Sequence, residues 1–148
     1  MQPWTWLTQD ERKTFVVRDE DDLMHCRTAA MDLAARAGFS QVDCVRITTA
    51  VSEIVRNALT YAGGGEMVLQ YEDETVTITV HDDGPGITDV EMAMRDGYSS
   101  SQSMGLGLPG AKRLMDSFDI ETNAGSGTTI VMRKKRYGMD RSAEAAAR

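Results

Sequence analysis

Glu53 and Asn57 lie four positions apart in a segment with a helical pattern, so their side chains share one helix face. An asparagine oxygen can coordinate Mg²⁺, which prefers oxygen ligands and bridges phosphate groups. A carboxylate one helical turn away can orient a hydroxyl group or a water molecule and accept its proton. Taken alone, the two residues favour a solvated helix face. The two glycine-rich segments that follow them shift the interpretation to metal-assisted phosphoryl chemistry.

Two glycine-rich segments follow this helix, Asp82-Asp83-Gly84-Pro85-Gly86 and Gly105-Leu106-Gly107-Leu108. Glycine lets the backbone approach a ligand closely, and exposed backbone N–H groups ahead of a helix bind phosphate. A carboxylate at the end of a strand can accept a hydrogen bond from the amino group of a base. These parts indicate an ATP site. No Gly-x-x-x-x-Gly-Lys-Ser/Thr motif occurs, so the site is not a P-loop.

The helix that carries Glu53 and Asn57 is predicted to begin at a cap, either Ser40 or Asp43, and to run to about Tyr61. The glycines at 63–65 would end it. Its apolar positions recur at helical spacing and form a core stripe: Val51, Ile54, Val55, Ala58 and Leu59. The rotation of about 100° per residue puts Glu53, Asn57 and Thr60 on the opposite face, away from the core.

Other helices are predicted on both sides of this one. An acidic cluster at 19–22 suits a helix N-terminus, and that helix would run to Arg36 with Gly38 as its stop. A short helix is predicted at 89–95. Pro109 suits the first turn of another helix, which would continue to about Ser117. Residues 96–103 lack apolar periodicity, which predicts a mobile lid.

The strands are predicted at 15–17 and in two hairpins, 67–71 with 75–81 and 120–123 with 129–132. In the strand at 75–81, Val76, Ile78 and Val80 alternate with polar residues and would face the core. Asp82 continues on that inner face, where an acid needs a partner, and Asp83 would be exposed. A turn residue before Gly-Pro-Gly is the alternative interpretation of Asp82.

The composition restricts the function classes. The 148 residues suit one domain, and a net charge of −7 argues against binding to nucleic acid or to an anionic membrane surface. No apolar run approaches the roughly 20 residues needed to span a bilayer, and no signal peptide is visible. Cys26 and Cys44 are interpreted as reduced, packed thiols of a cytoplasmic protein.

The order of the motifs resembles the GHKL family of ATPases and kinases, and the resemblance covers about residues 15–133. Its four motifs are Glu53-x-x-x-Asn57, Asp82-x-Gly84-x-Gly86, Gly105-x-Gly107 and Gly127-Thr128. Three longer segments are similar to the serine/threonine switch kinases of bacterial stressosomes, the RsbT type, which are related to anti-sigma regulatory factors. These segments are residues 52–57, 96–101 and 105–116.

The resemblance implies an α/β two-layer sandwich, the GHKL or Bergerat ATP-binding fold. Its mixed, mostly antiparallel sheet would carry helices on one face. The kinase domain would span residues 15–136, between an N-terminal extension at 1–14 and a C-terminal tail at 137–148.

The resemblance also assigns roles to site residues. Glu53 would be the catalytic base and Asn57 the Mg²⁺ ligand, while Asp82 would pair with the adenine amino group. The remaining nucleotide-binding positions would be Gly84, Gly86, Gly105, Leu106, Gly107, Leu108 and Thr128. The Thr128 hydroxyl would bond Asp82 or a water molecule beneath the adenine, and a plain β-branched strand residue is the alternative there.

The implied function is an ATP- and Mg²⁺-dependent protein serine/threonine kinase in a bacterial partner-switching stress pathway. Its phosphoryl acceptor would be a STAS-domain antagonist protein, and the freed kinase would engage a downstream phosphatase or sigma-factor regulator. The alternative function is an anti-sigma factor that acts mainly by sequestering a sigma factor. A detached histidine-kinase domain fits less well, because the chain has no room for a phosphoacceptor helical hairpin.

Overall fold

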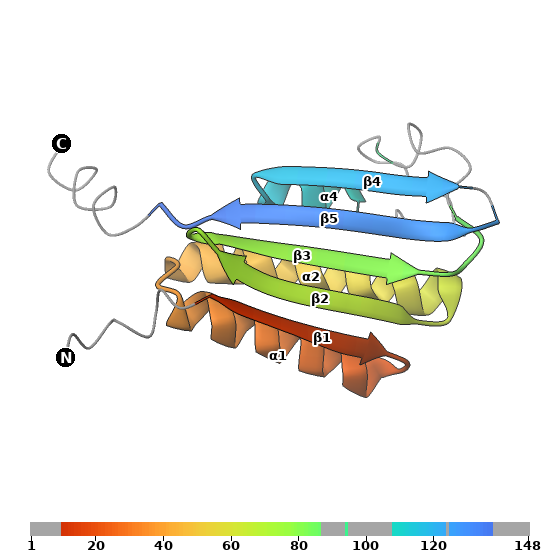
Figure 1. The fold of residues 1–148 in the computed structure, drawn as a ribbon, viewed down its shortest axis with the longest axis horizontal. Helices are drawn as coiled ribbons and strands as arrows, with labels where there is room; N and C mark the ends of the chain where they lie inside the picture. Colours follow the sequence, from red (N-terminus) through yellow and green to blue (C-terminus); the bar gives the residue numbers. More distant parts are fainter. Residues whose placement is uncertain (1–9, 87–93, 95–107, 124, 138–148) are drawn as a thin grey trace, which may run out of the picture.

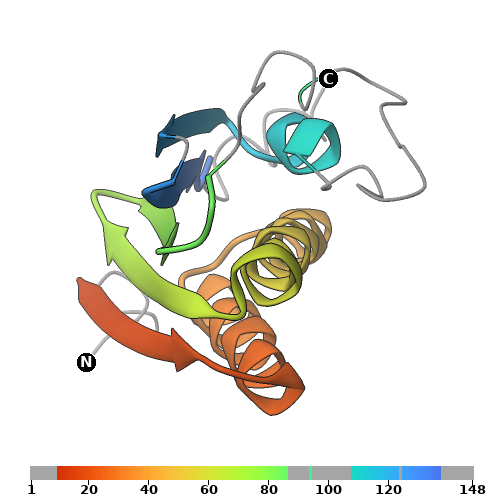
Figure 2. The ribbon, with the colours of Figure 1, turned by 90° about the vertical axis from the view of Figure 1, so that its right-hand side faces the viewer.

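The computed structural model describes residues 10–86, 94, 108–123 and 125–137. The elements are β1 (Glu11–Val17), α1 (Glu20–Arg36), α2 (Gln41–Ala62), β2 (Gly65–Glu72), β3 (Thr75–Asp82), α4 (Leu108–Leu114), β4 (Ser117–Asn123) and β5 (Gly127–Lys135). The five strands form one sheet in the order β1-β2-β3-β5-β4, with antiparallel neighbours throughout. The described helices lie on one face of this sheet (Figures 1 and 2). The predicted two-layer α/β sandwich is confirmed.

Side-chain caps fix where the two long helices begin. The Asp19 carboxylate accepts a hydrogen bond of 2.9 Å from the Asp22 N–H at the start of α1. The Ser40 hydroxyl accepts one of 3.1 Å from the Asp43 N–H at the start of α2. Ser40 is therefore the cap of α2, and Asp43 lies in its first turn. Gly63 ends the helix in a left-handed conformation.

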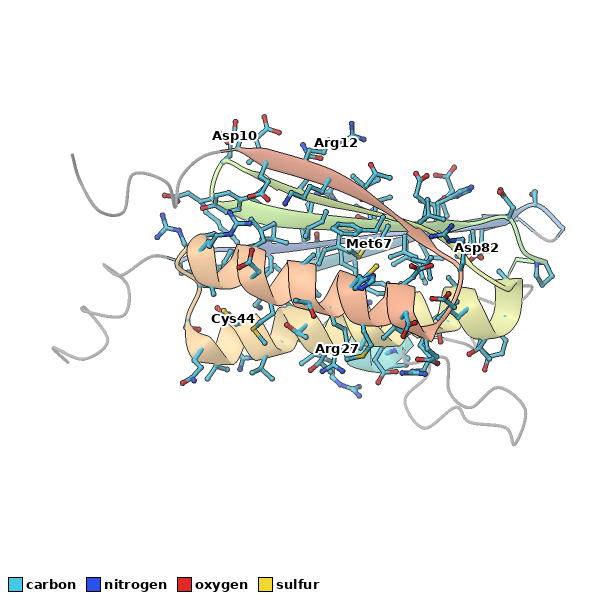
Figure 3. The ribbon with its side chains drawn as sticks, turned by 90° about the horizontal axis from the view of Figure 1, so that it is seen from below. Asp10, Arg12, Arg27, Cys44, Met67 and Asp82 are labelled. Carbon is cyan, nitrogen blue, oxygen red and sulfur yellow. The ribbon has the colours of Figure 1, made fainter. Side chains whose placement is uncertain are left out.

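The core lies between the sheet and the helices. Val51, Ile54, Val55 and Ala58 of α2 are buried, as the stripe predicts, and Leu59 packs against them from a partly buried position. Met67 of β2 lies in the same layer (Figure 3). Because α2 turns this stripe toward the sheet, the face that carries Glu53 points away from it.

Several element boundaries differ from the predicted ones. The first strand begins at Glu11 rather than at Phe15, because residues 11–14 pair with β2 although their side chains are mostly polar. The helix α4 ends at Leu114, three positions before the predicted end, and β4 begins at Ser117 after a short bend. The strand β5 extends from Gly127 to Lys135, beyond the predicted 129–132. Every residue of these extensions is paired with a residue of a neighbouring strand, so they belong to the sheet.

Some predicted features lie outside the described residues. These are the short helix at 89–95, apart from Met94, and the lid at 96–103 together with Gly105, Leu106 and Gly107. None of the described helices combines the length and the apolarity needed to cross a membrane.

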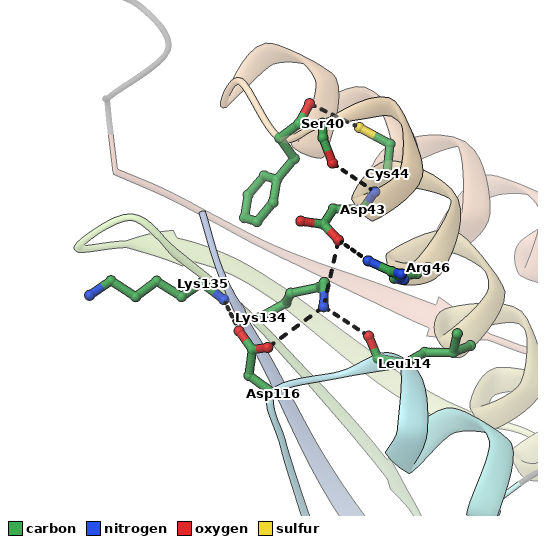
Figure 4. Close-up of polar contacts among 9 residues, drawn as sticks. Ser40, Asp43, Cys44, Arg46, Leu114, Asp116, Lys134 and Lys135 are labelled. Atoms are coloured by element: carbon green, nitrogen blue, oxygen red, sulfur yellow. Dashed lines mark hydrogen bonds and ion pairs between the residues drawn. The ribbon is translucent and has the colours of Figure 1, made fainter. Parts of the chain in front are cut away.

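A buried lysine joins three elements at the N-terminal end of α2 (Figure 4). Lys134 of β5 is only 6% exposed, and its ammonium group donates a hydrogen bond of 3.0 Å to the Leu114 carbonyl at the end of α4. The same nitrogen lies 3.7 Å from Asp43 and 3.6 Å from Asp116. All three ammonium hydrogens therefore have an acceptor nearby, which is what a buried lysine requires.

Candidate nucleotide-binding and catalytic site

The helix α2 carries the two residues predicted to act in phosphoryl transfer. Glu53 is exposed, and Asn57, one turn further along, is half-buried. The helix packs against α1, α4 and the sheet, so both side chains project from a firmly held backbone. An exposed carboxylate beside an amide oxygen can take a proton from an incoming hydroxyl group, and the amide oxygen can bind a cation.

Asp82 closes β3 at the opposite end of the sandwich from Lys134. Figure 3 labels it at the end of the sheet, between the strands and the helices. Its Oδ1 accepts a hydrogen bond of 2.9 Å from the Gly84 N–H. In the described part of the chain this is the only hydrogen bond to the carboxylate, so Oδ2 retains its capacity to accept one from a ligand. The side chain of Asp83 points to the other face of the sheet, toward His81, and is 92% exposed.

Close backbone contacts around Asp82 explain two of the glycines. A Cβ atom at Gly127 would collide with the Asp82 carbonyl oxygen, and Gly127 has a positive φ of 94°. A Cβ atom at Gly84 would lie 2.5 Å from the Cβ atom of Ala62, the last residue of α2. These glycines let the end of β3 approach both β5 and the end of α2. The result is a cradle of backbone around a carboxylate, which suits the close approach of a flat base.

Thr128 pairs with Asp82 across β3 and β5 and is 7% exposed. Its hydroxyl lies 2.9 Å from that of Thr122, which in turn donates 3.0 Å to the Gly127 carbonyl. Since Thr122 donates to that carbonyl, Thr128 is the donor between the two hydroxyls. Its oxygen keeps lone pairs that can accept from a ligand or a water molecule. Among the described residues, Thr128 therefore bonds Thr122 rather than Asp82.

Two contacts at this end were not foreseen from the sequence. His81 bridges two side chains on the other face of the sheet: Nδ1 lies 2.7 Å from the Thr129 hydroxyl and Nε2 lies 3.0 Å from Asp83. Gly65 lies so close to the His81 carbonyl that a Cβ atom there would collide with it. The alternation in the strand at 75–81 puts His81 on the face opposite Val80, but the sequence does not show the strand register that pairs His81 with Thr129.

The predicted site residues divide into three groups. The structure brings Asp82, Gly84 and Thr128 together at one end of the sheet, with Gly86 following in a positive-φ conformation. Glu53 and Asn57 share one face of α2, and Leu108 is buried at the start of α4, which packs on that helix. Gly105, Leu106 and Gly107 are outside the described residues. No group of three or more His, Cys, Asp or Glu side chains in the described ranges could hold a metal ion on its own.

A comparison with models of protein families shows which family the chain belongs to. Residues 14–134 match the histidine kinase-like ATPase domain. The chain belongs to this family. The predicted GHKL membership is confirmed, and ATP is the nucleotide that the family uses.

Two curated relatives are a serine/threonine-protein kinase and an anti-sigma factor. The serine/threonine-protein kinase RsbT of Bacillus subtilis (strain 168) is 43% identical over 118 residues, which cover 77% of this chain and 89% of the relative. An anti-sigma F factor of Clostridium novyi (strain NT) is 35% identical over 117 residues, covering 70% and 82%. The predicted class, a GHKL-type protein serine/threonine kinase, is confirmed by the first of these matches.

A solved structure supports the fold alone. The RsbU and RsbW domains of a Mycobacterium tuberculosis protein match with a TM-score of 0.60 at 21% identity. The match covers 86% of this chain and 32% of that one. The likeness thus agrees with the overall fold described above.

Proposed function

We propose that this chain is an ATP- and Mg²⁺-dependent protein serine/threonine kinase whose acceptor is a STAS-domain antagonist in a bacterial partner-switching stress pathway. The observation that carries the proposal is the exposed Glu53 one turn from Asn57 on α2, a helix that ends against the Asp82 turn. An exposed base can reach a hydroxyl group on another protein. The 43% identity to a serine/threonine-protein kinase supports the same reaction.

Each residue has a definite task in this proposal. Asp82 accepts a hydrogen bond from the adenine amino group through Oδ2, while Gly84 and Gly86 allow the base to approach the backbone. Thr128 accepts a hydrogen bond beneath the base. The segment of Gly105, Leu106, Gly107 and Leu108 binds the phosphates through its N–H groups. Asn57 would supply a side-chain oxygen ligand to Mg²⁺.

Glu53 then acts as the general base. It accepts the proton of the serine or threonine hydroxyl as that oxygen bonds to the γ-phosphorus and the bond to ADP breaks. When bound, Mg²⁺ neutralises the charge that develops on the phosphate oxygens. The phosphorylated antagonist leaves, and the kinase becomes available to a downstream phosphatase or sigma-factor regulator. We place this cycle in the cytoplasm and in a domain spanning residues 15–136, flanked by an extension at 1–14 and a tail at 137–148.

A transfer assay tests the proposal. Glu53→Gln keeps the shape of the side chain but removes the base, so we expect transfer of labelled γ-phosphate to a STAS protein to slow by about 10²–10⁴-fold. ATP affinity should stay nearly unchanged. Asn57→Ala should weaken Mg-ATP binding as well as transfer, because it removes a metal ligand. Glu72→Gln, at an exposed glutamate of β2, is the matched control and should transfer at the wild-type rate.

An anti-sigma factor remains the second candidate, because anti-sigma F factors are 35% identical to this chain. The same assay separates the two functions. Transfer that is absent in the wild type, together with tight nucleotide-dependent binding to a sigma factor, would favour sequestration. Full transfer activity in Glu53→Gln would remove the general-base role from that residue.

A further inference from the structure

Four exposed apolar side chains lie on the solvent side of the helix layer. Met24 and Met31 belong to α1, Val42 and Val45 belong to α2, and the exposed fractions of the four lie between 37% and 58%. Helical spacing places the two methionines on one face of α1 and the two valines on one face of α2. We call these four residues the outer patch.

Contacts between α1 and α2 bring the two halves of the outer patch together. The Thr48 hydroxyl lies 3.8 Å from the Met31 sulfur, and Arg56 forms an ion pair of 2.9 Å with Glu20. The two helices therefore run antiparallel, with the second half of α1 beside the first half of α2. Val45 lies one turn before Thr48 on the same side of α2, which places it next to Met31.

The described chain begins at the same end of the molecule. Glu11, the first residue of β1, accepts hydrogen bonds of 2.8 and 3.0 Å from Arg36, the last residue of α1. Figure 3 labels Asp10 at the end where Cys44 lies, near the start of α2. Met31 is five residues from Arg36, or about 7.5 Å along the helix axis. Residues 1–9 thus join the described chain close to the outer patch.

The composition of residues 1–9 suits an apolar surface. The segment contains no charged side chain, and it contains both tryptophans of the chain, Trp4 and Trp6, together with Leu7. Segments that remain in water are typically charged and poor in aromatic residues. A tryptophan that packs against other side chains buries a large area, and methionine sulfur makes favourable contacts with aromatic rings.

The segment is long enough to reach the outer patch. An extended chain spans about 3.3 Å per residue, so Trp6 can lie about 13 Å and Trp4 about 20 Å from Asp10. A helix with its side chains is about 10–12 Å across. The segment can therefore pass around the end of α1 and place both rings over Met31 and Val45.

We propose that residues 1–9 bind the outer patch of their own chain, with the two tryptophans against the exposed methionine and valine side chains. A short flexible tether holds the segment at an effective concentration on the order of millimolar, so a weak contact is sufficient. A second copy supplies the same segment only at the bulk protein concentration. The proposal goes beyond the kinase function, because it uses no residue of the nucleotide site.

Tryptophan fluorescence tests the proposal on the full chain, because Trp4 and Trp6 are the only tryptophans in the sequence. The wild type should emit at shorter wavelength than N-acetyl-tryptophanamide, which is fully exposed to water. A segment that is bound half of the time should be quenched by acrylamide about twofold more weakly. Val45→Asp places a charge in the outer patch, so it should shift the emission to longer wavelength and restore quenching. Circular dichroism checks that each variant is folded.

Val16→Asp is the matched control, since Val16 and Val45 are both 54% exposed but Val16 lies on β1. Its emission should match that of the wild type. Wild-type tryptophans quenched as strongly as N-acetyl-tryptophanamide would overturn the proposal and leave the outer patch to another protein. A folded Val45→Asp protein with wild-type emission would overturn it as well. Emission that moves to longer wavelength on dilution would place the segment on a second copy, against the proposal.

Discussion

The two ends of α2 are built in opposite ways. At the N-terminal end, charged side chains are paired: Lys134 lies near two carboxylates, and Arg36 of α1 makes two hydrogen bonds to Glu11 of β1, at 2.8 and 3.0 Å. At the C-terminal end, backbones meet without side chains between them. Gly84 lies against Ala62, and Gly127 lies against the Asp82 carbonyl.

The difference shows how one small α/β sandwich can hold its elements rigidly at one end and leave room for a ligand at the other. The polar end fixes α1, α2, α4 and the sheet relative to one another through ion pairs and hydrogen bonds. At the glycine end, the described residues leave a carboxylate oxygen and nearby backbone unoccupied by side chains, as a ligand site requires. Substitutions at the first end should therefore act on folding stability. At the second end, substitutions that keep the backbone turn should act on nucleotide binding, and those that add an atom at a glycine should act on stability.

The largest effect on stability is expected at Lys134. Lys134→Met keeps the side-chain length but leaves Asp43, Asp116 and the Leu114 carbonyl without their ammonium partner. Breaking a buried ion pair in this way costs on the order of 3–5 kcal/mol, here measured as the free energy of unfolding in urea. Lys135→Met, at the exposed neighbouring position, is the control and should change stability little.

A second variant shows whether the acids cause that loss. Adding Asp116→Asn to Lys134→Met removes one of the unpaired charges, so part of the lost stability should return. If the double variant were less stable than Lys134→Met by the full cost of Asp116→Asn alone, the two groups would not be coupled.

At the glycine end, Gly127→Ala should be the most disruptive single change. It adds a Cβ atom against the Asp82 carbonyl and forces alanine into a positive φ, together costing about 2–3 kcal/mol. Gly110→Ala in α4 adds a Cβ atom into open space at an ordinary helical φ, so it should be neutral or stabilising by up to about 1 kcal/mol. Thermal unfolding of the two variants compares them directly.

The sequence predicted the main elements of both ends but not the contacts between distant segments. Caps, stripes and alternation predicted both long helices, the hairpins and the inward side of Asp82. Lys134 belongs to a basic run that normally lies at the surface. The predicted strand stopped at 132, so the inward series Thr128, Ile130 and Met132 was not extended to Lys134, and the packing of α4 against α2 supplies its acceptors. The contact of Gly84 with Ala62 likewise depends on the tertiary arrangement of two distant segments.

Asp82→Asn should weaken ATP binding without changing stability much. The amide oxygen of asparagine can still accept from the Gly84 N–H, so the turn is preserved. Its NH₂ group then points where Oδ2 was and meets the adenine amino group donor to donor. The expected cost is on the order of 1–3 kcal/mol, measured by calorimetry.

Asp83→Asn is the control for that experiment, because Asp83 is exposed and its partner is His81 on the other face of the sheet. It should bind ATP as the wild type does. Equal affinity for wild type and Asp82→Asn would mean that Asp82 does not contact the base, and loss of binding in Asp83→Asn alone would move the role to the neighbouring acid.

The smallest effect is expected at Glu11, and it should depend on pH. The hydrogen bond from Arg36, with a smaller contribution from its charge, lowers the pKa of the Glu11 carboxyl in the folded protein. A carboxyl with a lowered folded-state pKa contributes stability above its unfolded pKa of about 4.3, and this contribution is lost as the pH falls through the folded-state pKa. Because the pair is partly exposed, Glu11→Gln should cost under about 1 kcal/mol at neutral pH. Below the folded-state pKa, Glu11 is protonated in both states and resembles glutamine, so urea unfolding curves of the two proteins should converge in acid. A stability difference that persisted unchanged into that acid range would show that Glu11 acts by packing against α1 and not by its charge.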